Sequence, residues 1–492
     1  MTTAMTDLMA HVADPERAER IEAVRRKIDA LKIDYVYVQF VSVTGRVLGK
    51  GIPSDHWESV AKRGVQTVYS AMANVAADRR GDFIGYGSQD SELVALPDPE
   101  TFCQLPWNKR AARVFCTLFR NREEAHAPGS YLTSDSRGNL KRIYQAFQDR
   151  HDGLQMRVGC EPEMLWLKKG SDGKPDGGMT SPYAYHVEQF EVLSEVIMRV
   201  NDYARAMGLD MIQADHEDAP GQVEQNFQFD DCLRTADRLT TYRQICAQVG
   251  REFGLIPCFM SKPYMGVSAN GCHHNISFWR GGEDVVNRLG MDELPGMEAL
   301  FAYRRGGDNA FRGDGESWRP SPLGEHCIAG IVEHMPALTA IGCSSVNSYR
   351  RMLDLGLWAP VFADWGLQNR TCALRVSSPD RMEYRSVDSM VNPYLMMSAL
   401  LQAVDHGISD RLDAGEPQQG NVYDLPEEEQ AGKRLPTNLG EALAALAKDE
   451  VVRSALPGDM YRVFEHHKRD EWERFNATVT QWDVDTYIDC LP

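Results

Sequence analysis

Two glutamates stand two residues apart at the head of an apolar run. The stretch reads GCEPEMLWL, and its acids are Glu161 and Glu163. Because side chains alternate along a β-strand, a strand here sends both carboxylates to one face. Two buried like charges are costly unless one is protonated, the face is wet, or cations lie between them. The pair therefore suggests a metal site.

Further acids and a histidine favour the cation explanation. They are Glu217 and Glu224 in DHEDAPGQVE, His273 in NGCHHNIS, and Glu383 in RMEYR. Carboxylate oxygens with a single imidazole suit Mg²⁺ or Mn²⁺ better than Zn²⁺, which prefers more His or Cys. Any one of these acids alone is more often solvated or ion-paired, so the prediction depends on the combination.

Several arginines lie in the same C-terminal half of the chain. Guanidinium groups near metal-bound carboxylates suit phosphoryl transfer, because charge develops on the transferred oxygens and must be neutralised. For Arg350 and Arg381 we expect structural ion pairs. The candidates for binding substrate anions are Arg351, Arg370, Arg375 and Arg385.

The elements that must position these residues begin with a helix and a hairpin. Asp14 followed by Pro15 marks a helix start, and residues 35–52 are rich in β-branched and aromatic residues around a turn. The polar, turn-rich residues 122–135 mark a boundary. The sequence predicts two domains, residues 1–121 and 122–492.

The second part of the chain alternates helices with strands that carry charged residues. Apolar spacing predicts one amphipathic helix from Val187 to about Gly208. Residues 413–440 are polar with Gly and Pro, as in a surface excursion, and a helical tail follows. Strands are expected around residues 211–229, 271–279 and 371–385.

Composition excludes several classes of protein. The chain has 492 residues, 43% hydrophobic and 25% charged, which is ordinary globular composition. Its net charge of -18 disfavours a nucleic-acid partner. The start lacks a signal peptide and no 18-residue apolar run occurs, so we expect a cytoplasmic protein without a membrane partner. The eleven cysteines form no C-x-x-C pair and are expected to be reduced, buried thiols.

Taken in order, the motifs resemble those of the glutamine synthetase family. The similarity covers nearly the whole chain and is strongest from about residue 159 to residue 400. Besides the segments quoted above, the matching motifs are HCIAGIVEHMPALTAIGCSSVNSYRRM, NRTCALRV and NPYLMMSALL. A lone E-x-E is unspecific, whereas ordered motifs at family spacing are highly specific.

The resemblance implies an α+β fold with a small N-terminal β-grasp domain. It also implies a C-terminal catalytic domain whose curved antiparallel sheet forms a half-barrel with surrounding helices. Such enzymes are homo-oligomers with active sites between subunits, and a dodecamer of two hexameric rings is expected. They use ATP as co-substrate to phosphorylate the γ-carboxylate of glutamate, and a nitrogen nucleophile then displaces phosphate.

The matched positions carry the family's roles onto this sequence, with two or three Mg²⁺ or Mn²⁺ ions per active site. One ion is implied at Glu163, Glu217 and Glu224, and another at Glu161, His273 and Glu383. Glutamate binding is implied for Arg351, Arg385 and Gly271. ATP binding is implied for Phe229, Asn275, Ser277, Arg370 and Arg375. The catalytic roles fall to Arg370, Glu217 and Arg385.

Two acids that hold ammonium in ammonia-using members are absent here. The family's F-D-G-S-S is represented by VYSAM at residues 68–72, without its Asp. The flap P-G-Y-E-A-P reads LGLWAP, so Trp358 stands at the position of a Glu. Ammonium is a small cation that needs carboxylates to bind it and accept its proton. The changes therefore favour another nucleophile.

An apolar, weakly basic amine fits the changed residues. Trp358 and Tyr69 can stack against an aromatic ring, each pair contributing about 0.5–1.5 kcal/mol beyond burial. Ser70 and Tyr185 complete the expected amine pocket. Aniline is uncharged at neutral pH and needs no carboxylate, so the sequence predicts γ-glutamylanilide synthesis, the first step of aniline degradation. Packing of the flap is the plainer explanation of Trp358.

Other departures leave alternatives open. Asn275 replaces a family His that contacts phosphate, and the altered loop at 267–271 puts glutamate itself in question, although Arg351 and Arg385 argue for an acidic substrate. The stretch GNVYDLPEEE places Tyr423 where some bacterial members carry an adenylylation tyrosine. The competing functions are ligation of an alkylamine or polyamine, ordinary glutamine synthesis, and a non-catalytic scaffold. The full set of six metal ligands argues against the scaffold.

Overall fold

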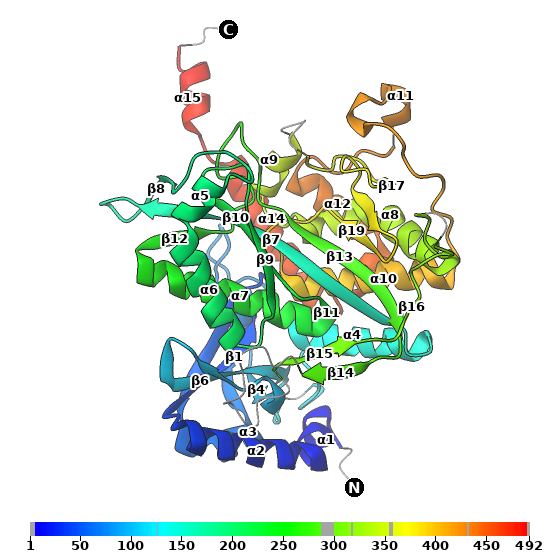
Figure 1. Cartoon of the computed structure of the whole chain (residues 1–492). Coiled ribbons are helices and arrows are strands. Elements are labelled where there is room, and N and C mark those ends of the chain that lie inside the picture. The colour runs from blue at the N-terminus through cyan, green and yellow to red at the C-terminus, as the bar shows by residue number, and fades with distance from the viewer. Residues whose placement is uncertain are drawn as a thin grey trace.

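The computed structural model describes residues 5–124, 126–286, 300–315, 318–353, 358–430 and 432–489. Figure 1 shows a small sheet near the N-terminus and a larger sheet above it, with helices packed around the larger one. This mixed architecture with a curved, mostly antiparallel sheet confirms the predicted α+β class. The division into domains 1–121 and 122–492 stays a prediction.

The small sheet has six strands in the order β2-β1-β6-β4-β3, with β5 paired to β6. Neighbours are antiparallel except β1 and β6, which run parallel. The predicted hairpin is confirmed, because Tyr35 pairs with Pro53 across β1 and β2. The strands are β1 Tyr35–Val41, β2 Val47–Pro53, β3 Val65–Val68, β4 Glu92–Pro97, β5 Cys103–Leu105 and β6 Asn108–Phe119.

The predicted N-terminal helix is confirmed and packs on this sheet. Asp14 caps α2, since its Oδ1 accepts a hydrogen bond from the Glu16 amide at 3.1 Å. The buried Trp57 indole donates to the Ile21 carbonyl at 3.0 Å, which ties α3 to α2. The helical elements of this part are α1 Asp7–Ala13, α2 Pro15–Leu31, η1 Ser54–His56, α3 Trp57–Arg63, η2 Tyr69–Ala73 and η3 Pro99–Thr101.

The large sheet has eleven strands, with the central order β17-β18-β19-β13-β7-β10-β9. Its pairs are antiparallel apart from β17 and β18, and the strands expected near 211–229, 271–279 and 371–385 are present. A separate hairpin joins β14 Glu283–Val286 to β15 Ala302–Arg305. The strands are β7 Gln155–Lys169, β8 Pro175–Gly178, β9 Met211–His216, β10 Gln222–Phe227, β11 Asp230–Asp231, β12 Leu255–Cys258, β13 Cys272–Arg280, β16 Asp308–Asn309, β17 Trp365–Leu367, β18 Leu374–Ser378 and β19 Arg381–Tyr384.

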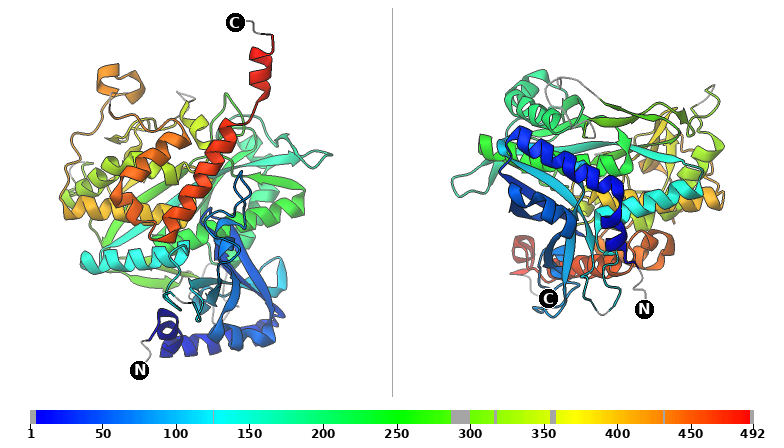
Figure 2. Two further views of the ribbon diagram at one scale, coloured as in Figure 1. Left: turned by 180° about the vertical axis from the view of Figure 1, so that it is seen from behind. Right: turned by 90° about the horizontal axis from the view of Figure 1, so that it is seen from below.

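Helices cover the back of the large sheet as it is seen in Figure 1, and the reverse view in Figure 2 shows α14 lying across them. Helices α8 and α10 approach closely, because a Cβ atom on Gly330 would lie 2.2 Å from the Ala403 carbonyl oxygen. The helices of this layer are α4 Ser136–Arg150, α7 Cys232–Phe253, α8 Pro322–Gly342, α9 Ser348–Leu353, α10 Pro393–Ser409, α12 Leu439–Lys448, α13 Glu450–Ser454 and α14 Asp459–Asn476.

The single helix predicted from Val187 to about Gly208 is wrong in its continuity. The structure has two helices, α5 Val187–Val192 and α6 Ser194–Ala206, separated at Leu193. Leu193 is fully buried and Val196 and Val200 continue its face, whereas Val187 is 77% exposed. The apolar spacing therefore marked the face of α6 correctly but ran on into α5, a separate helix with no fully buried residue.

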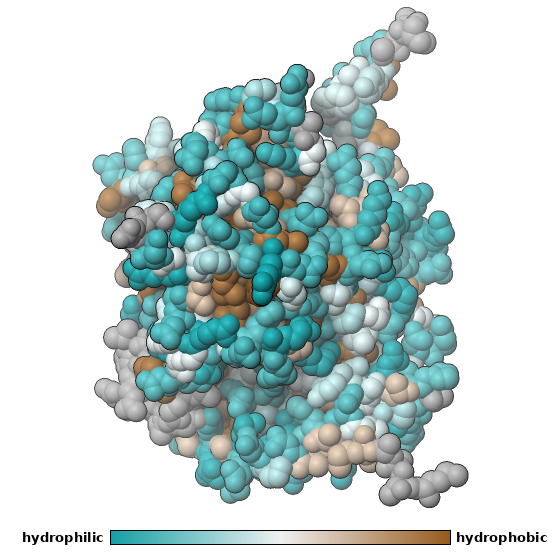
Figure 3. All heavy atoms as spheres, turned by 90° about the vertical axis from the view of Figure 1, so that its right-hand side faces the viewer, coloured by the Kyte–Doolittle hydropathy of each residue, from teal (hydrophilic) through white to brown (hydrophobic). Residues whose placement is uncertain are grey.

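The surface excursion and the helical tail are both present. Residues 413–440 contain only the short η4 Val422–Asp424 and α11 Glu427–Gln430 before α12 begins. The tail ends in α15 Gln481–Tyr487, which projects from the body in Figure 1. The face in Figure 3 is largely hydrophilic, in keeping with a net charge of -18.

Two expectations from composition can be compared with the described residues. Ten cysteines lie among them, all are free, and all but Cys258 are buried. No described helix is long and apolar enough to cross a membrane.

Candidate active site

Three side chains from adjacent strands meet at the centre of the large sheet. Glu161 on β7 lies opposite His273 on β13, and Glu383 on β19 flanks them on the other side. The His273 Nδ1 atom is 3.2 Å from a Glu161 carboxylate oxygen and 3.6 Å from one of Glu383. The ligand atoms of all three lie within 4.8 Å of one another. Strand register thus assembles a group that could hold a metal ion.

Glu163 lies beside this group and is held by backbone and amide donors. Its Oε2 accepts hydrogen bonds from the Gly271 amide at 2.9 Å and from the Gln222 side chain at 3.1 Å. Gly271 itself borders the cluster, because a Cβ added there would come 2.9 Å from His273 Nε2 and 3.0 Å from Glu163 Oε1. Gly271 is therefore at the predicted site, with no room for a side chain.

Glu224 and Glu217 bring two more carboxyl groups to the same region. Glu224 on β10 pairs directly with Glu163 on β7, and the Asn226 side chain donates to it at 2.8 Å. Among the described residues, the three carboxyl groups of Glu163, Glu217 and Glu224 do not form a group as tight as the first. They are close enough to influence one another's titration.

Burial and mutual repulsion change the titration of these acids. Burial and the nearby Glu217 raise the pKa of Glu163 to about 8. Burial and Asp215 raise the pKa of Glu217 to about 7, and burial with Glu161 raises the pKa of Glu224 well above its usual value. Without a counter-ion, such acids bind protons in place of cations.

The donor set fits hard divalent cations. Carboxylate oxygens predominate, and burial together with Arg385 lowers the pKa of His273 well below its usual value, so its imidazole is neutral and free to act as a ligand. Mg²⁺ and Mn²⁺ prefer such oxygen-rich sets with at most one imidazole. A cation here would also offset the repulsion that raises the pKa values of the acids.

Three of the predicted arginines border the cluster. Arg385 and Arg375 both bond the Glu383 carboxylate, the latter at 2.8 Å, and Glu383 is only 3% exposed. Burial would raise the pKa of Glu383, but the charge of Arg385 lowers it below the usual value. Arg351 donates to the Arg385 carbonyl at 3.1 Å, and its Nη2 lies 3.4 Å from His273 Nε2.

Arg370 lies in a turn of the loop between β17 and β18 and is exposed. Its charge acts on Glu217, on His273 and on the Tyr185 hydroxyl, which places it over the same region. Tyr185 is 69% exposed, and Glu217, followed by burial, raises its pKa. Both side chains are available to a bound molecule.

The residues predicted to bind the nucleotide follow β13 away from the acids. Asn275 bridges two charges, donating to Glu161 at 2.7 Å and accepting from Arg381 at 2.9 Å. Arg381 thus has an amide partner in place of the expected carboxylate. Ser277 accepts from the Trp279 indole at 2.8 Å.

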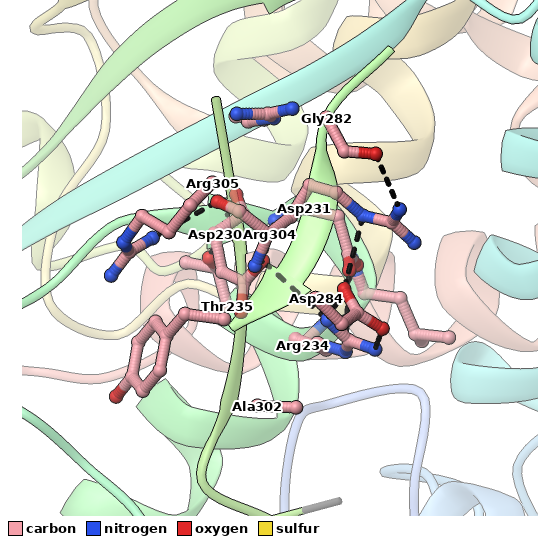
Figure 4. A network of polar contacts seen from close by, with 12 residues as sticks. Asp230, Asp231, Arg234, Thr235, Gly282, Asp284, Ala302, Arg304 and Arg305 are labelled. Carbon is pink, nitrogen blue, oxygen red and sulfur yellow. Dashed lines mark hydrogen bonds and ion pairs between the residues drawn. The ribbon is translucent and has the colours of Figure 1, made fainter. Parts of the chain in front are cut away.

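An aromatic and cationic stack surrounds Phe229, and sequence reasoning missed most of it. Trp279 stacks on Phe229 with ring centroids 6.4 Å apart, and the Arg305 guanidinium lies 5.4 Å from the centroid of Phe229. Arg305 comes from the β14–β15 hairpin, which Arg234 and Asp284 tie to α7 through a 2.7 Å ion pair (Figure 4). No motif contained these residues, because their meeting depends on the hairpin's tertiary position.

The predicted amine-pocket residues are not all brought together. Trp358 is 55% exposed with φ of 63°, and its carbonyl accepts a hydrogen bond from Arg385 at 3.2 Å. Tyr69 and Ser70 are buried in η2 of the N-terminal part. The Tyr69 hydroxyl donates to Glu124 at 2.5 Å and its ring stacks on Tyr86, so Tyr69 presents no free face to its own chain's Trp358. Residues 355–357 of the flap lie outside the described residues.

The hydroxyl of Tyr423 is engaged. It donates to the Ala359 carbonyl at 2.6 Å, and burial raises its pKa. A group attached to this oxygen would remove the hydrogen that the bond uses. Adenylylation of Tyr423 stays a prediction.

A second cluster of metal-ligand types lies on the opposite face of β7 and β13. It contains the buried Cys160, Cys272 and His274, with ligand atoms within 4.8 Å of one another. The His274 Nδ1 atom donates to the Cys272 carbonyl oxygen at 2.7 Å, so this nitrogen carries a hydrogen and is not free for a metal. The cluster is a buried polar network behind the site.

Comparisons with known proteins agree with this geometry. The family model of the glutamine synthetase catalytic domain matches residues 133–293 and 298–487. A protein named glutamate–methylamine ligase, from Methyloversatilis universalis, is 31% identical over 470 residues, covering 93% of this chain and 97% of its own. A glutamine synthetase from Pyrococcus furiosus is 30% identical over 487 residues, covering 95% and 99%. A solved structure described as "Apo GmaS without ligand" aligns with a TM-score of 0.79 at 27% identity, covering 95% and 99%.

A curved sheet that gathers acids and arginines at its centre, in a chain with these relatives, defines an ATP-dependent ligase that joins glutamate to an amine. The chain belongs to the glutamine synthetase family.

Proposed function

We propose that this ligase joins the γ-carboxylate of glutamate to a primary amine with an apolar substituent, in preference to ammonia. The observation that carries the proposal is the position of Trp358. Its carbonyl contacts Arg385 at the acidic cluster, and its indole is 55% exposed. An uncharged indole at this place offers contact to an apolar group and no carboxylate for ammonium.

The acidic cluster is the proposed site of phosphoryl transfer. Glu161, His273 and Glu383 would hold one divalent ion, and Glu163, Glu217 and Glu224 another. Mg²⁺ or Mn²⁺, when bound, would offset the repulsion between the phosphates of ATP and the attacking carboxylate. The donor set does not distinguish the two metals.

The arginines are proposed to orient the reacting groups. Arg351 and Arg385, which are 5% and 3% exposed, are rigidly held and suited to grip the substrate carboxylates beside Gly271. The exposed Arg370 and the half-buried Arg375 would neutralise charge on the transferred phosphoryl group. Phe229, Asn275 and Ser277 would bind the nucleotide.

The proposed reaction has two steps. A γ-carboxylate oxygen of glutamate bonds to the γ-phosphorus of ATP while the bond from that phosphorus to ADP breaks. The amine nitrogen then bonds to the carbonyl carbon of the γ-glutamyl phosphate, the bond from that carbon to the phosphate oxygen breaks, phosphate leaves, and the nitrogen loses one proton.

Two kinds of amine are candidates. An aromatic amine such as aniline is favoured by the exposed indole, which has a free face for stacking. A small alkylamine is favoured by the similarity to a protein named glutamate–methylamine ligase. Both candidates carry an apolar group that ammonia lacks.

We also propose that the site is completed in an oligomer, such as a dodecamer of two rings. The support is that Tyr69 and Ser70, buried in η2, do not meet Trp358 within one chain. They could reach an amine pocket only if that part of a second copy lay against the site. The two-domain division at residues 1–121 and 122–492 is part of this proposal.

The test is phosphate release with ATP, glutamate and a panel of ammonia, methylamine, isopropylamine, putrescine and aniline. We expect kcat/KM for methylamine or aniline to exceed that for ammonia by at least tenfold, which is roughly what one apolar contact supplies. Ammonia as the best substrate would overturn the proposal.

A further inference from the structure

The polar excursion at residues 413–440 is bonded to the chain segment that borders the amine side of the site. We define this amine-side segment as residues 358–371. At one end of the excursion, the Gln418 amide donates to the Trp365 carbonyl at 2.9 Å. The Asn369 side chain donates to the Gly420 carbonyl at 2.8 Å, directly beside Arg370.

The other end of the excursion pairs with the start of the same segment. The Leu435 amide donates to the Val361 carbonyl at 2.9 Å, and the Ala363 amide donates to the Lys433 carbonyl at 2.6 Å. The excursion therefore holds the amine-side segment at both ends. Hydrogen bonds at both ends therefore fix the position of the excursion relative to residues 358–371.

Tyr423 lies between these two anchors and makes the contact nearest to the site. Its hydroxyl donates to the Ala359 carbonyl at 2.6 Å, and Ala359 directly follows Trp358. The Trp358 carbonyl in turn accepts from Arg385 at 3.2 Å, and Arg385 bonds the Glu383 carboxylate. Tyr423 is thus linked to the acidic cluster through one short stretch of backbone.

The backbone at Trp358 needs such support. Its φ of 63° lies in the left-handed region, which is unfavourable for a residue with a large side chain. Residues hold such a conformation only when neighbouring contacts fix it. Among the described residues, the hydrogen bonds to this stretch come from Arg385 at Trp358 and from Tyr423 at Ala359.

We propose that Tyr423 is a positioning residue that sets the orientation of Trp358 and thereby the binding of the amine. This inference depends on the proposed role of Trp358 in the amine pocket. The Tyr423 hydroxyl bonds a backbone carbonyl and not a side chain of the acidic cluster. Its effect passes through the Ala359 carbonyl to the peptide whose oxygen contacts Arg385.

The first experiment compares steady-state kinetics of the wild type, Tyr423→Phe and a matched control, Tyr394→Phe. The Tyr394 hydroxyl also makes one short bond, to Asp237 at 2.7 Å, but lies in α10 outside the site. For the amine that the wild type uses best, we expect Tyr423→Phe to raise KM by about fivefold, as the loss of one hydrogen bond allows. The kcat value and the KM for ATP should stay within about twofold. An unchanged amine KM, or an equal change in all three constants, would overturn the proposal.

The second experiment reads the structure without activity. In hydrogen exchange on the full chain, the amides of Ala363 and Leu435, which close the anchor, should exchange faster in Tyr423→Phe than in the wild type and Tyr394→Phe. Equal exchange in all three would contradict the proposal. If the wild type prefers ammonia, the proposed function is wrong. The inference about Tyr423 is still tested, because KM is measured for the amine that the wild type uses best.

Discussion

The acidic side and the proposed amine side of the active site are held by different kinds of structure. On the acidic side, Glu161, His273 and Glu383 project from three paired strands, and His273 and Glu383 are 9% and 3% exposed. On the amine side, Trp358 and Tyr185 lie in connecting segments and are 55% and 69% exposed. The acidic side is fixed by strand register, whereas the amine side depends on loop conformation.

The difference extends to the backbone. Trp358 and Tyr185 both have left-handed φ values, 63° and 62°. Such residues are costly to hold and cluster at functional sites. We therefore expect a change of amine to need alterations on the proposed amine side, while the strands of the acidic side stay as they are.

The largest effect is expected from removing a ligand on the acidic side. Glu161→Gln keeps the shape of the side chain but removes its negative charge and one of its two oxygens near His273, so kcat should fall by about a hundredfold or more. Steady-state kinetics at several Mn²⁺ concentrations measure it. The control is Glu58→Gln, which breaks a partly exposed ion pair with Arg25 and should leave kcat unchanged. Wild-type kcat in Glu161→Gln would exclude Glu161 from the site.

A substitution on the amine side should change selectivity more than rate. Trp358→Glu restores an acid near Arg385, so the ratio of kcat/KM for ammonia to that for the preferred amine should rise by about fiftyfold. The amine panel used for the wild type measures this ratio. An unchanged ratio would assign the indole to packing of the flap.

The strands of the acidic side were predictable because they depend on local patterns, whereas the metal ligands stay a prediction. Period-two alternation marks Glu161 and Glu163 as facing one way, and the paired register of β7 and β10 adds Glu224. The break between α5 and α6 was not predictable from apolar spacing, since burial of Leu193 depends on tertiary packing. The Phe229 stack with Arg305 was also missed, because the hairpin that supplies Arg305 carries no recognisable motif.

Filling the space beside the cluster should have an intermediate effect. Gly271→Ala would place a Cβ 2.9 Å from His273 Nε2 and 3.3 Å from an Arg351 nitrogen, forcing both to shift by tenths of an ångström. We expect kcat/KM for glutamate to fall by about tenfold, because catalysis is sensitive to small displacements. Gly420→Ala is the control, since no atom lies within 4 Å of its added Cβ. Equal activity in both variants would remove Gly271 from the glutamate site.

The smallest expected effect is a pH dependence of stability in metal-free protein. The pKa of Glu163 is raised from 4.5 to about 8, so the folded state binds this proton more tightly than the unfolded state does. The free energy of unfolding should therefore fall as pH rises from about 4.5 to about 8, by up to about 1.4 kcal/mol per pH unit for this group. Urea unfolding in the presence of a chelator measures the slope.

Two comparisons sharpen this prediction. Glu163→Gln cannot lose a proton at this position, so its slope should be shallower. Added Mg²⁺ or Mn²⁺ should flatten the wild-type slope by replacing the protons. Stability that rises with pH in the metal-free wild type would contradict the repulsive arrangement of Glu163, Glu217 and Glu224.

The separation of the two sides is tested most directly by positional isotope exchange, with glutamate and ATP but no amine. ATP labelled with oxygen-18 in its β,γ-bridge scrambles the label only when the γ-phosphoryl group is transferred reversibly to glutamate. We expect Trp358→Glu to scramble within about twofold of the wild-type rate and Glu161→Gln to show almost no scrambling. Loss of scrambling in Trp358→Glu to the same degree as in Glu161→Gln would show that the two sides do not act separately.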